Sequence, residues 1–206
     1  MNDIEQSRPH VFITGASGLL GTALINELIG AGFSILAHYH THKPFENEHC
    51  HWVKGDFSSV GKIRDFIRIN KEALSSCSIL INNYGPITST PLPSLKARDI
   101  LHDYHHNVIP VFEFTRFFIN NAPLLAVVNI LFDGAGKFQP YKKIVSYAMA
   151  KNAIISLSNS FASQYPGIRF HLVKPSTMKG ARVKAKDGVE VSPHTIASYI
   201  REILTQ

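Results

Sequence analysis

Short apolar runs alternate with longer amphipathic runs along the whole chain, and this alternation restricts the fold more than any other feature. Strands that are apolar nearly throughout are typical of a sheet buried on both faces. Alternation with helical patterns indicates parallel strands whose connecting helices cover both faces. The sequence predicts strands at 11–15, 33–39, 51–56, 78–83, 124–130 and 169–175. It predicts helices at 19–32, 59–74, 99–121, 147–165 and 192–204.

The predicted fold class is α/β, with a doubly wound, Rossmann-like parallel sheet of about six strands. No internal repeat and no change of composition indicates a second domain, so we expect a single domain over residues 1–206. One connection departs from the pattern. The segment from Thr41 to His49 is too short, and too interrupted by Pro44, to form a full crossover helix.

The ends and the apolar runs of the chain argue against a membrane or secreted protein. The first ten residues, MNDIEQSRPH, are polar and include acids, unlike a signal or transit peptide. The longest apolar run, PLLAVVNILF, is far too short to span a bilayer. Cys50 and Cys77 form neither a disulfide framework nor a CxxC motif, which favours buried thiols in a reducing compartment. We therefore expect a soluble, cytoplasmic protein without a membrane partner.

The net charge of +6 and the pI near 9.3 are compatible with nucleic acid or with a smaller anionic ligand. One cluster of cations stands out, and it has neither interleaved aromatic residues nor a helical face, so no nucleic-acid partner is predicted. The cluster consists of Lys174, Lys179, Arg182, Lys184 and Lys186.

The segment TGASGLLG, from Thr14 to Gly21, lies between the first predicted strand and the first predicted helix. Gly15 permits a tight turn, Gly18 permits a pyrophosphate to approach the backbone, and Gly21 permits close packing of helix and strand. The free N–H groups at the start of the helix favour an anion there. Because the strand before, the helix after and a second strand are all present, the segment predicts a dinucleotide-binding turn.

The second predicted strand ends in HYHTHK, residues 38–43, where three histidines occupy alternate positions. In a dinucleotide fold the residue about 20 positions beyond the glycines contacts the adenosine ribose, and an acid there selects NAD. Counting from Gly21 leads to Thr41, and the segment contains no acid. Donors and positive charge instead predict a pocket for the 2′-phosphate of NADPH. Its predicted residues are His40, Thr41, His42 and Lys43.

Two alternatives for these histidines stay open. Histidine is the commonest metal ligand, and His49 and His51 are near in sequence, so a zinc site is a minority interpretation. Solvated histidines at a strand end are the plainer one. We predict no metal.

The segment YAMAK places Tyr147 and Lys151 four residues apart, on one face of a helix. A phenol has a pKa near 10, and a fixed ammonium nearby favours the phenolate and lowers that value. The pair therefore suits a proton donor to a carbonyl.

The order of these motifs resembles the short-chain dehydrogenase/reductase family along almost the whole chain. The order is TGxxGxxG, then DF at 56–57, NNYG at 82–85, a helix that carries Asn107, and YxxxK. Within that family, HYHTHKP is similar to the end of the second strand of pteridine reductases and dihydromonapterin reductases, which use NADPH.

The resemblance implies a role for each matching residue. Tyr147 is implied as the general acid, Lys151 as the residue that holds the nicotinamide ribose and lowers the tyrosine pKa, and Asn107 as the residue that positions a relay water. The implied cofactor residues are Gly15, Ser17, Gly18, Leu20, Gly21, Asp56, Phe57, Asn83, Tyr84, Gly85, Lys151, Pro175 and Thr177. Alternatively, Asp56 caps a helix and Asn107 is a polar residue on a helix surface.

The chain departs from the family at the catalytic serine, which normally lies some thirteen residues before the tyrosine. The corresponding segment, VVNILFDGAG, contains no hydroxyl. Counting forward from Asn129 places Phe132 at the serine position, and counting back from Tyr147 places Gly134 there. Pteridine reductases resemble this arrangement in using an aspartate, so Asp133 is the predicted replacement. An acid in a turn is the alternative.

Two further departures concern the later part of the chain. Ser176 follows Pro175 where the family usually has glycine. We also expect a shortened C-terminus, because the last strand and the Gly-Gly tail of longer members are missing. The basic stretch KGARVKAKDG then occupies the substrate lid, where it meets an anionic substrate or stays solvated.

Together these features predict an NADPH-dependent reductase that transfers a hydride to a carbonyl or imine of a small molecule, with a pterin as the sharper version. The alternative is a protein that binds NADPH without significant turnover, as a sensor or an assembly subunit. The resemblance also implies a homodimer or homotetramer through the helices that carry Asn107 and Tyr147.

Overall fold

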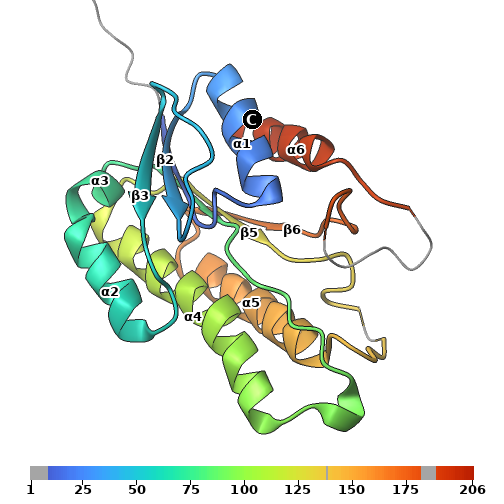
Figure 1. Ribbon diagram of the computed structural model, residues 1–206. Helices are drawn as coiled ribbons and strands as arrows, with labels where there is room; N and C mark the ends of the chain where they lie inside the picture. The colour runs from blue at the N-terminus through green and yellow to red at the C-terminus, as the bar shows by residue number, and fades with distance from the viewer. Residues whose placement is uncertain (1–8, 138, 182–188) are drawn as a thin grey trace, which may run out of the picture.

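The computed structural model describes residues 9–137, 139–181 and 189–206, and its strands form one parallel sheet (Figure 1). The strand order is β3-β2-β1-β4-β5-β6. The strands are β1 (His10–Ile13), β2 (Ser34–Tyr39), β3 (Cys50–Lys54), β4 (Ile79–Asn82), β5 (Ala126–Ile130) and β6 (Arg169–Val173). The six-stranded, doubly wound parallel sheet predicted from the alternation of runs is confirmed.

Helices cover both faces of the sheet (Figure 1). The helices are α1 (Leu19–Gly30), α2 (Val60–Ile69), α3 (Lys71–Ser75), α4 (Ala97–Asn121), α5 (Val145–Gln164) and α6 (Pro193–Thr205), with a 3₁₀ turn η1 (Leu92–Ser94). Within β1, Val11 and Ile13 pack into the core beneath α1 and α6, whereas Phe12 packs with α2 and α4. Successive strand side chains point to opposite faces, and both faces of the central strands are covered, which is why most positions of β1, β2, β4 and β5 are apolar.

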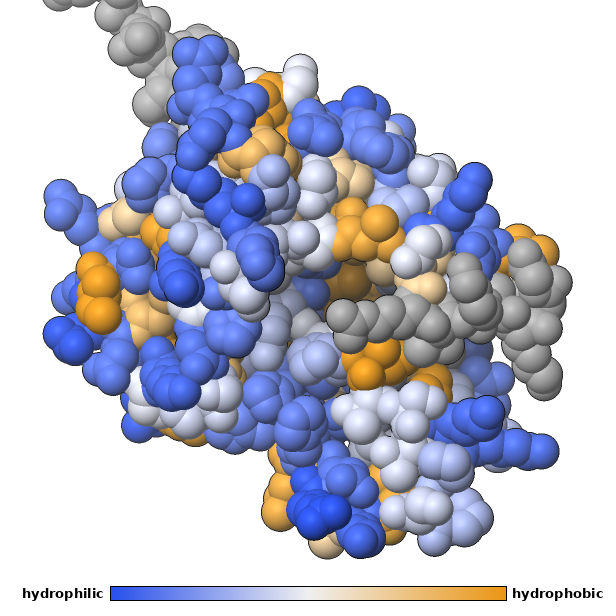
Figure 2. Space-filling view, in the orientation of Figure 1, coloured by the Kyte–Doolittle hydropathy of each residue, from blue (hydrophilic) through white to orange (hydrophobic). Residues whose placement is uncertain are grey.

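The strand order reverses between β1 and β4, whose crossovers leave in opposite directions. In a doubly wound sheet, this reversal opens a crevice beyond the carboxyl ends of the strands, and ligands bind there. Figure 2 has the same orientation as Figure 1. It shows a hollow near the middle of the face turned to the viewer, beyond the start of α1, with apolar side chains beside it. The segments after Ile13, Tyr39, Asn82 and Ile130 therefore surround the candidate site.

The structure differs from the sequence prediction at one helix. The single helix predicted over 59–74 is divided at Asn70, between α2 and α3. The side chain of Asn70 donates a hydrogen bond to the carbonyl of Phe66 at 2.8 Å. Asparagine offers the backbone such local partners, which favours helix ends over helix interiors. The expected absence of a full helix between Thr41 and His49 is confirmed, since that segment contains only a bridge from Asn47 to Cys50.

Two features of composition are placed by the fold. Cys50 and Cys77 are buried and unpaired, and burial raises the pKa of each thiol to about 12. Among the helices that the structure describes, none combines the length and apolar character needed to cross a bilayer. Within the basic cluster, Arg182, Lys184 and Lys186 lie outside the described residues.

A chain of buried side-chain amides links two strands to α5. Asn82 donates from Nδ2 to Oδ1 of Asn129 at 2.8 Å, across the β4–β5 pair. Asn129 in turn donates to the hydroxyl of Ser158 at 2.8 Å, and that hydroxyl donates to the carbonyl of Ile154. All three side chains are buried, so these hydrogen bonds replace part of the water that burial removes, while Oδ1 of Asn82 has no partner among the described residues.

Candidate active site

The turn from Thr14 to Gly21 leads from the end of β1 into α1, as predicted. Gly15 has φ of 62°, and a Cβ there would lie 2.9 Å from the Cα of Tyr84. A Cβ on Gly21 would lie 2.5 Å from the carbonyl oxygen of Ala16. Leu20 is buried in the core, so only its backbone faces the turn. Within the described part of the chain, the N–H groups of Leu19 and Leu20 have no hydrogen-bond partner, and free N–H groups at a helix start favour an anion.

The end of β4 is fastened to this turn. The hydroxyl of Thr14 accepts hydrogen bonds from the N–H groups of Asn83 and Tyr84, both at 3.0 Å. The side chain of Asn83 donates to the carbonyl of Gly15 at 2.9 Å. Two motifs almost seventy residues apart thus form one rigid unit at the switch point, with Ser17 and Gly18 on its solvent side.

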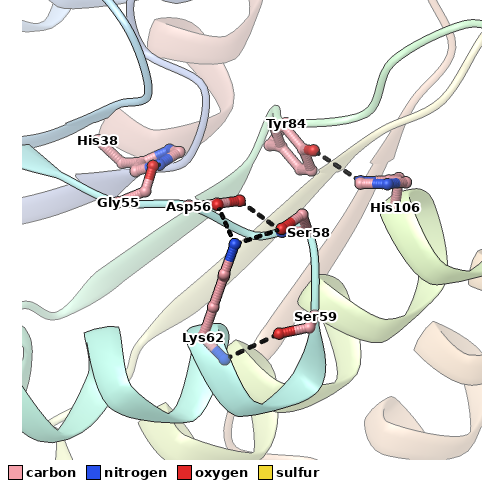
Figure 3. Close-up of polar contacts among 8 residues, drawn as sticks. All are labelled: His38, Gly55, Asp56, Ser58, Ser59, Lys62, Tyr84 and His106. Carbon is pink, nitrogen blue, oxygen red and sulfur yellow. Dashed lines mark hydrogen bonds and ion pairs between the residues drawn. The ribbon is translucent and has the colours of Figure 1, made fainter.

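His38 has a role that its sequence context does not indicate. Its ring is buried, Nδ1 accepts a hydrogen bond from the N–H of Gly15 at 2.9 Å, and Nε2 lies 3.2 Å from the carbonyl of Gly55 (Figure 3). These contacts require the neutral ring with its proton on Nε2. Burial, opposed by the hydrogen bond to Gly55, lowers the pKa of His38 to about 4. The three histidines at alternate positions do not lie along one strand face, because β2 ends at Tyr39, and only His38 is buried while His40 and His42 are exposed.

This buried histidine predicts acid-sensitive stability. The pKa of His38 is about 4 in the folded chain against an ordinary 6.5, so the unfolded chain binds more protons between these values. Its contribution is complete above pH 6.5 and declines by about 1.4 kcal/mol per pH unit down to pH 4. Between about pH 7.5 and pH 5, urea unfolding should show wild type losing about 2 kcal/mol more than His38→Gln. His51→Gln, at an exposed site, should behave as wild type; equal losses in all three proteins would refute the prediction.

Asp56 lies just beyond β3, where the adenine is predicted. Its carboxylate accepts a hydrogen bond from the N–H of Ser58 at 2.8 Å and forms an ion pair with Lys62 at 2.6 Å (Figure 3). The hydrogen bond from Lys62 is the main reason that the pKa of Asp56 lies far below its usual value. The alternative that Asp56 caps the next helix is wrong, because Ser59 is the N-cap of α2.

Aromatic rings pack behind Asp56. Phe57 is buried and stacks on the ring of His38 with centroids 3.9 Å apart, so it offers a bound nucleotide only its backbone. The ring of Tyr84 packs edge-on against Phe57, and its hydroxyl lies 2.9 Å from Nδ1 of His106 on α4 (Figure 3). The predicted adenine corner is therefore held by α4 as well as by the strand ends.

The segment after β2 lies beside the glycine turn, because the N–H of Ala16 donates to the carbonyl of His38 at 2.8 Å. Its side chains are exposed, and that of Lys43 forms an ion pair with Glu46. The exposed residues are His40, Thr41, His42 and Lys43. Among the described residues no group of three or more histidine, cysteine or acidic side chains converges as metal ligands.

Two predicted catalytic residues, Asn107 and Lys151, meet beside Gly85, and Tyr147 lies next to Lys151. A Cβ on Gly85 would lie 2.5 Å from Oδ1 of Asn107 and 2.8 Å from Nζ of Lys151. Asn107 donates to the carbonyl of Pro86, and its Oδ1 is buried without a partner among the described residues. Lys151 donates to the carbonyl of Ile130 at 2.9 Å, and its Nζ lies 5.5 Å from the centre of the Tyr147 ring. The alternative that Asn107 is a polar residue on a helix surface is wrong, since it is fully buried.

The electrostatics of this cluster differ from the sequence expectation. Burial lowers the pKa of Lys151 to about 8. Burial, followed by the charge of Asp103, raises the pKa of Tyr147 well above its ordinary value. Lys151 therefore does not bring the pKa of Tyr147 below its ordinary value in this arrangement, and its effect on the tyrosine stays a prediction. The ammonium lies over the ring, and the loss of water around the phenol is the main cause of the raised pKa.

The segment at the predicted serine position contains a phenylalanine next to the tyrosine. The ring of Phe132 lies 5.5 Å from that of Tyr147 and 5.7 Å from that of Tyr141. Asp133 is exposed, its N–H donates to the carbonyl of Pro175 at 2.9 Å, and its carboxylate has no hydrogen bond within the described chain. Phe132 therefore takes the place nearest Tyr147. The catalytic role of Asp133 stays a prediction.

The residues after β6 complete the rim of the site. Pro175 is half-buried beside Asp133, and the carbonyl of Thr177 accepts a hydrogen bond from Val191 at 2.9 Å. Asp103, Ser146 and His106 were not predicted from the sequence. Asp103 contacts Asn107, His106 contacts Tyr84, and Ser146 binds Asp103. Their signal was positional: Asp103 precedes Asn107 by one helical turn, and Ser146 is adjacent to Tyr147.

A parallel sheet with its switch point at a glycine turn, facing a helix with a tyrosine and a buried lysine, defines a dinucleotide-binding α/β protein of oxidoreductase type. The chain belongs to the short-chain dehydrogenase family, whose model, described as "short chain dehydrogenase", matches residues 9–189. A comparison with curated proteins found no match.

Solved structures share this fold at low sequence identity. A short-chain dehydrogenase from Streptomyces avermitilis is 17% identical, with a TM-score of 0.83 over 97% of this chain and 85% of that chain. An alcohol dehydrogenase from Thermococcus sibiricus complexed with 5-hydroxy-NADP is 19% identical, with a TM-score of 0.83 over 97% and 92%. A short chain dehydrogenase from Leptospira borgpetersenii with bound NAD+ is 16% identical, with a TM-score of 0.80 over 94% and 84%.

Proposed function

We propose that this protein is an NADPH-dependent reductase of carbonyl or imine groups in a small molecule. The observation that carries the proposal is that Asn107 and Lys151 meet at the bare backbone of Gly85, with the ring of Tyr147 next to the Lys151 ammonium. The unpartnered Oδ1 of Asn107 and the unpartnered N–H groups at the start of α1 are polar groups that a dinucleotide and its waters would satisfy.

The residues present fit a nicotinamide dinucleotide. The turn at Gly15, Ser17, Gly18, Leu20 and Gly21 would hold the pyrophosphate through backbone N–H groups. Asp56 and the backbone of Phe57 would hold the adenine, Asn83, Tyr84 and Gly85 would lie under the nucleoside, and Lys151, Pro175 and Thr177 would surround the nicotinamide ribose and amide. The cofactor, when bound, supplies the hydride.

Tyr147 would supply the proton, from its hydroxyl to the substrate oxygen or nitrogen. Its raised pKa keeps that proton in place at neutral pH. Lys151, with a pKa of about 8, still carries most of its charge at pH 7 and would stabilise the tyrosinate left after the transfer. Asn107 would hold the water that returns a proton.

The sharper version of the proposal is a pterin-like substrate, supported by the segment HYHTHK and by Asp133. A panel of dihydropterins, quinones and simple ketones tests both versions by NADPH consumption. Turnover restricted to dihydropterins and lost in Asp133→Ala would support the pterin site. Turnover of ketones that is retained in Asp133→Ala would support the general reductase and reject the pterin version.

A second candidate is NADPH binding without significant turnover, as in a sensor or an assembly subunit. The contact between Phe132 and the Tyr147 ring favours it, because an apolar ring there offers no hydroxyl to a developing oxyanion. Loss of one such donor typically costs about a hundred- to a thousandfold in rate. Tight NADPH binding with no consumption across the panel would favour this candidate.

We predict that Lys43→Ala weakens NADPH binding about tenfold and leaves NADH binding unchanged, since a cation beside the 2′-phosphate contributes about 1.4 kcal/mol. Fluorescence titration of both cofactors measures the two constants. Lys71→Ala, at an exposed site on α3, is the control. Equal weakening of NADPH binding and NADH binding would show that Lys43 does not bind the 2′-phosphate.

We further propose that residues 1–206 act as one cytoplasmic domain that assembles as a homodimer or homotetramer through α4 and α5. The support is an apolar face shared by the two helices, on which Phe112 and Phe161 stack with centroids 6.3 Å apart. Tyr104 and Met149, from the same pair of helices, are exposed apolar side chains. Light scattering of wild type and of Phe112→Glu tests this assembly.

A further inference from the structure

Asp103 is a fully buried acid on α4 for which the proposed reaction has no role. A buried carboxylate costs several kcal/mol unless hydrogen bonds compensate it. One carboxylate oxygen accepts a hydrogen bond from the hydroxyl of Thr88, and the other accepts one from the hydroxyl of Ser146 at 2.5 Å. Nδ1 of His102 lies 3.6 Å from the first oxygen.

These contacts tie three segments together around the proposed acid. Thr88 belongs to the loop after β4, Asp103 to α4, and Ser146 to the first turn of α5. Ser146 immediately precedes Tyr147. The carboxylate therefore fixes the backbone from which the Tyr147 side chain projects.

Asp103 also reaches the second polar group of the cluster. Its backbone carbonyl accepts a hydrogen bond from Nδ2 of Asn107 at 3.1 Å, and the carbonyl of Pro86 accepts from the same amide. With both amide hydrogens occupied in this way, Oδ1 of Asn107 is directed toward Gly85 and Lys151. Asp103 thus binds Ser146, the neighbour of Tyr147, through its carboxylate, and it binds Asn107 through its backbone carbonyl.

We propose that Asp103 is a positioning residue, which orients Tyr147 through Ser146 and keeps it in its proton-donating form. This inference rests on the proposed function, because it assigns Asp103 to the same reaction. Among the described residues, the charged groups that face Tyr147 are Lys151 on its own helix and Asp103 on α4, while His102 faces Asp103. An asparagine at 103 retains the shape, loses the charge and can accept hydrogen bonds at only one atom.

The test compares Asp103→Asn with Asp65→Asn, an exposed acid on α2, in steady-state kinetics across pH. We expect kcat to fall about ten- to a hundredfold in Asp103→Asn with the KM for NADPH unchanged, because displacing a catalytic group by about 1 Å costs up to a hundredfold. Asp103 raises the pKa of Tyr147, so its neutralisation should move the alkaline loss of reductase activity to lower pH. Unchanged kcat and pH profile, even with a lower melting temperature, would overturn the inference.

Two further measurements keep the test decisive. If Asp103→Asn does not fold, Ser146→Ala removes the hydrogen bond between Ser146 and Asp103 and keeps the charge of Asp103. This variant should lower kcat about tenfold and leave the pH profile unchanged. A wild-type kcat in Ser146→Ala would overturn the inference. If wild type has no turnover, the proposed function fails. The ultraviolet titration of tyrosinate, taken as the difference from a matched Tyr147→Phe variant, then tests Asp103 alone. The Tyr147 signal should appear at lower pH in Asp103→Asn, and an unchanged signal would overturn the inference.

Discussion

Tyr147→Phe should lower kcat by about a thousandfold or more while NADPH binds with unchanged affinity. General acids contribute about a hundred- to ten-thousandfold to rate, and this substitution removes only the hydroxyl that would donate the proton. Phenylalanine retains the ring, so the contacts of the ring with Phe132 and with the Lys151 ammonium remain. The variant should therefore fold as wild type does. Single-turnover kinetics and a cofactor titration separate the two effects.

Tyr141→Phe is the matched control, because Tyr141 also packs against Phe132 and its hydroxyl donates only to the carbonyl of Gly134. It should retain wild-type kcat within a few-fold. A Tyr147→Phe enzyme that retained more than about a tenth of the wild-type rate would remove Tyr147 from the role of general acid.

Gly21→Ala should destabilise the protein by about 3 kcal/mol and abolish NADPH binding. A Cβ at this position would lie 2.5 Å from the carbonyl oxygen of Ala16 and 2.6 Å from its Cα, and both are backbone atoms. Backbone cannot rotate away as a side chain can, so α1 would have to move off the turn, and overpacking of this kind costs about 1–3 kcal/mol or more. Urea unfolding and a cofactor titration measure the two losses.

Gly30→Ala provides the comparison within the same helix. Nothing lies within 4 Å of a Cβ at Gly30, the last residue of α1. This variant should bind NADPH normally and gain up to about 1 kcal/mol, since alanine favours helix over glycine. If Gly21→Ala were as stable as Gly30→Ala, the tight packing of α1 on the turn would be disproved.

The fold was predictable because the strands are short, apolar and separated by helical patterns, which together leave few topologies. The predicted strand ends lie within a few residues of those observed. The division of the 59–74 helix at Asn70 was not predicted, because the residues on both sides are good helix formers and only the local hydrogen bond to Phe66 favours the break.

The sequence predicts which residues belong to the site better than it predicts their burial and contacts. Motifs far apart in sequence meet because the carboxyl ends of parallel strands lie at one edge of the sheet, so Asn83 and Gly15 were expected together. The direction in which His38 points and the burial of Tyr147 depend on neighbours contributed by other elements, which strand periodicity does not contain. Asp103 was missed because its hydroxyl partners, Thr88 and Ser146, are remote in sequence.

The buried amides of Asn82 and Asn129 disfavour pairings of β4 and β5 in a wrong register. The two residues lie directly opposite each other across β4 and β5, and all the remaining positions of these two strands are aliphatic. Aliphatic side chains pack almost equally well after a slip of one residue, so they specify alignment weakly. A slip would bury both amides against hydrocarbon at about 1–3 kcal/mol each, and would carry the NNYG segment away from the glycine turn. The polar side chains of these two strands thus favour the one alignment in which the chain assembles its site.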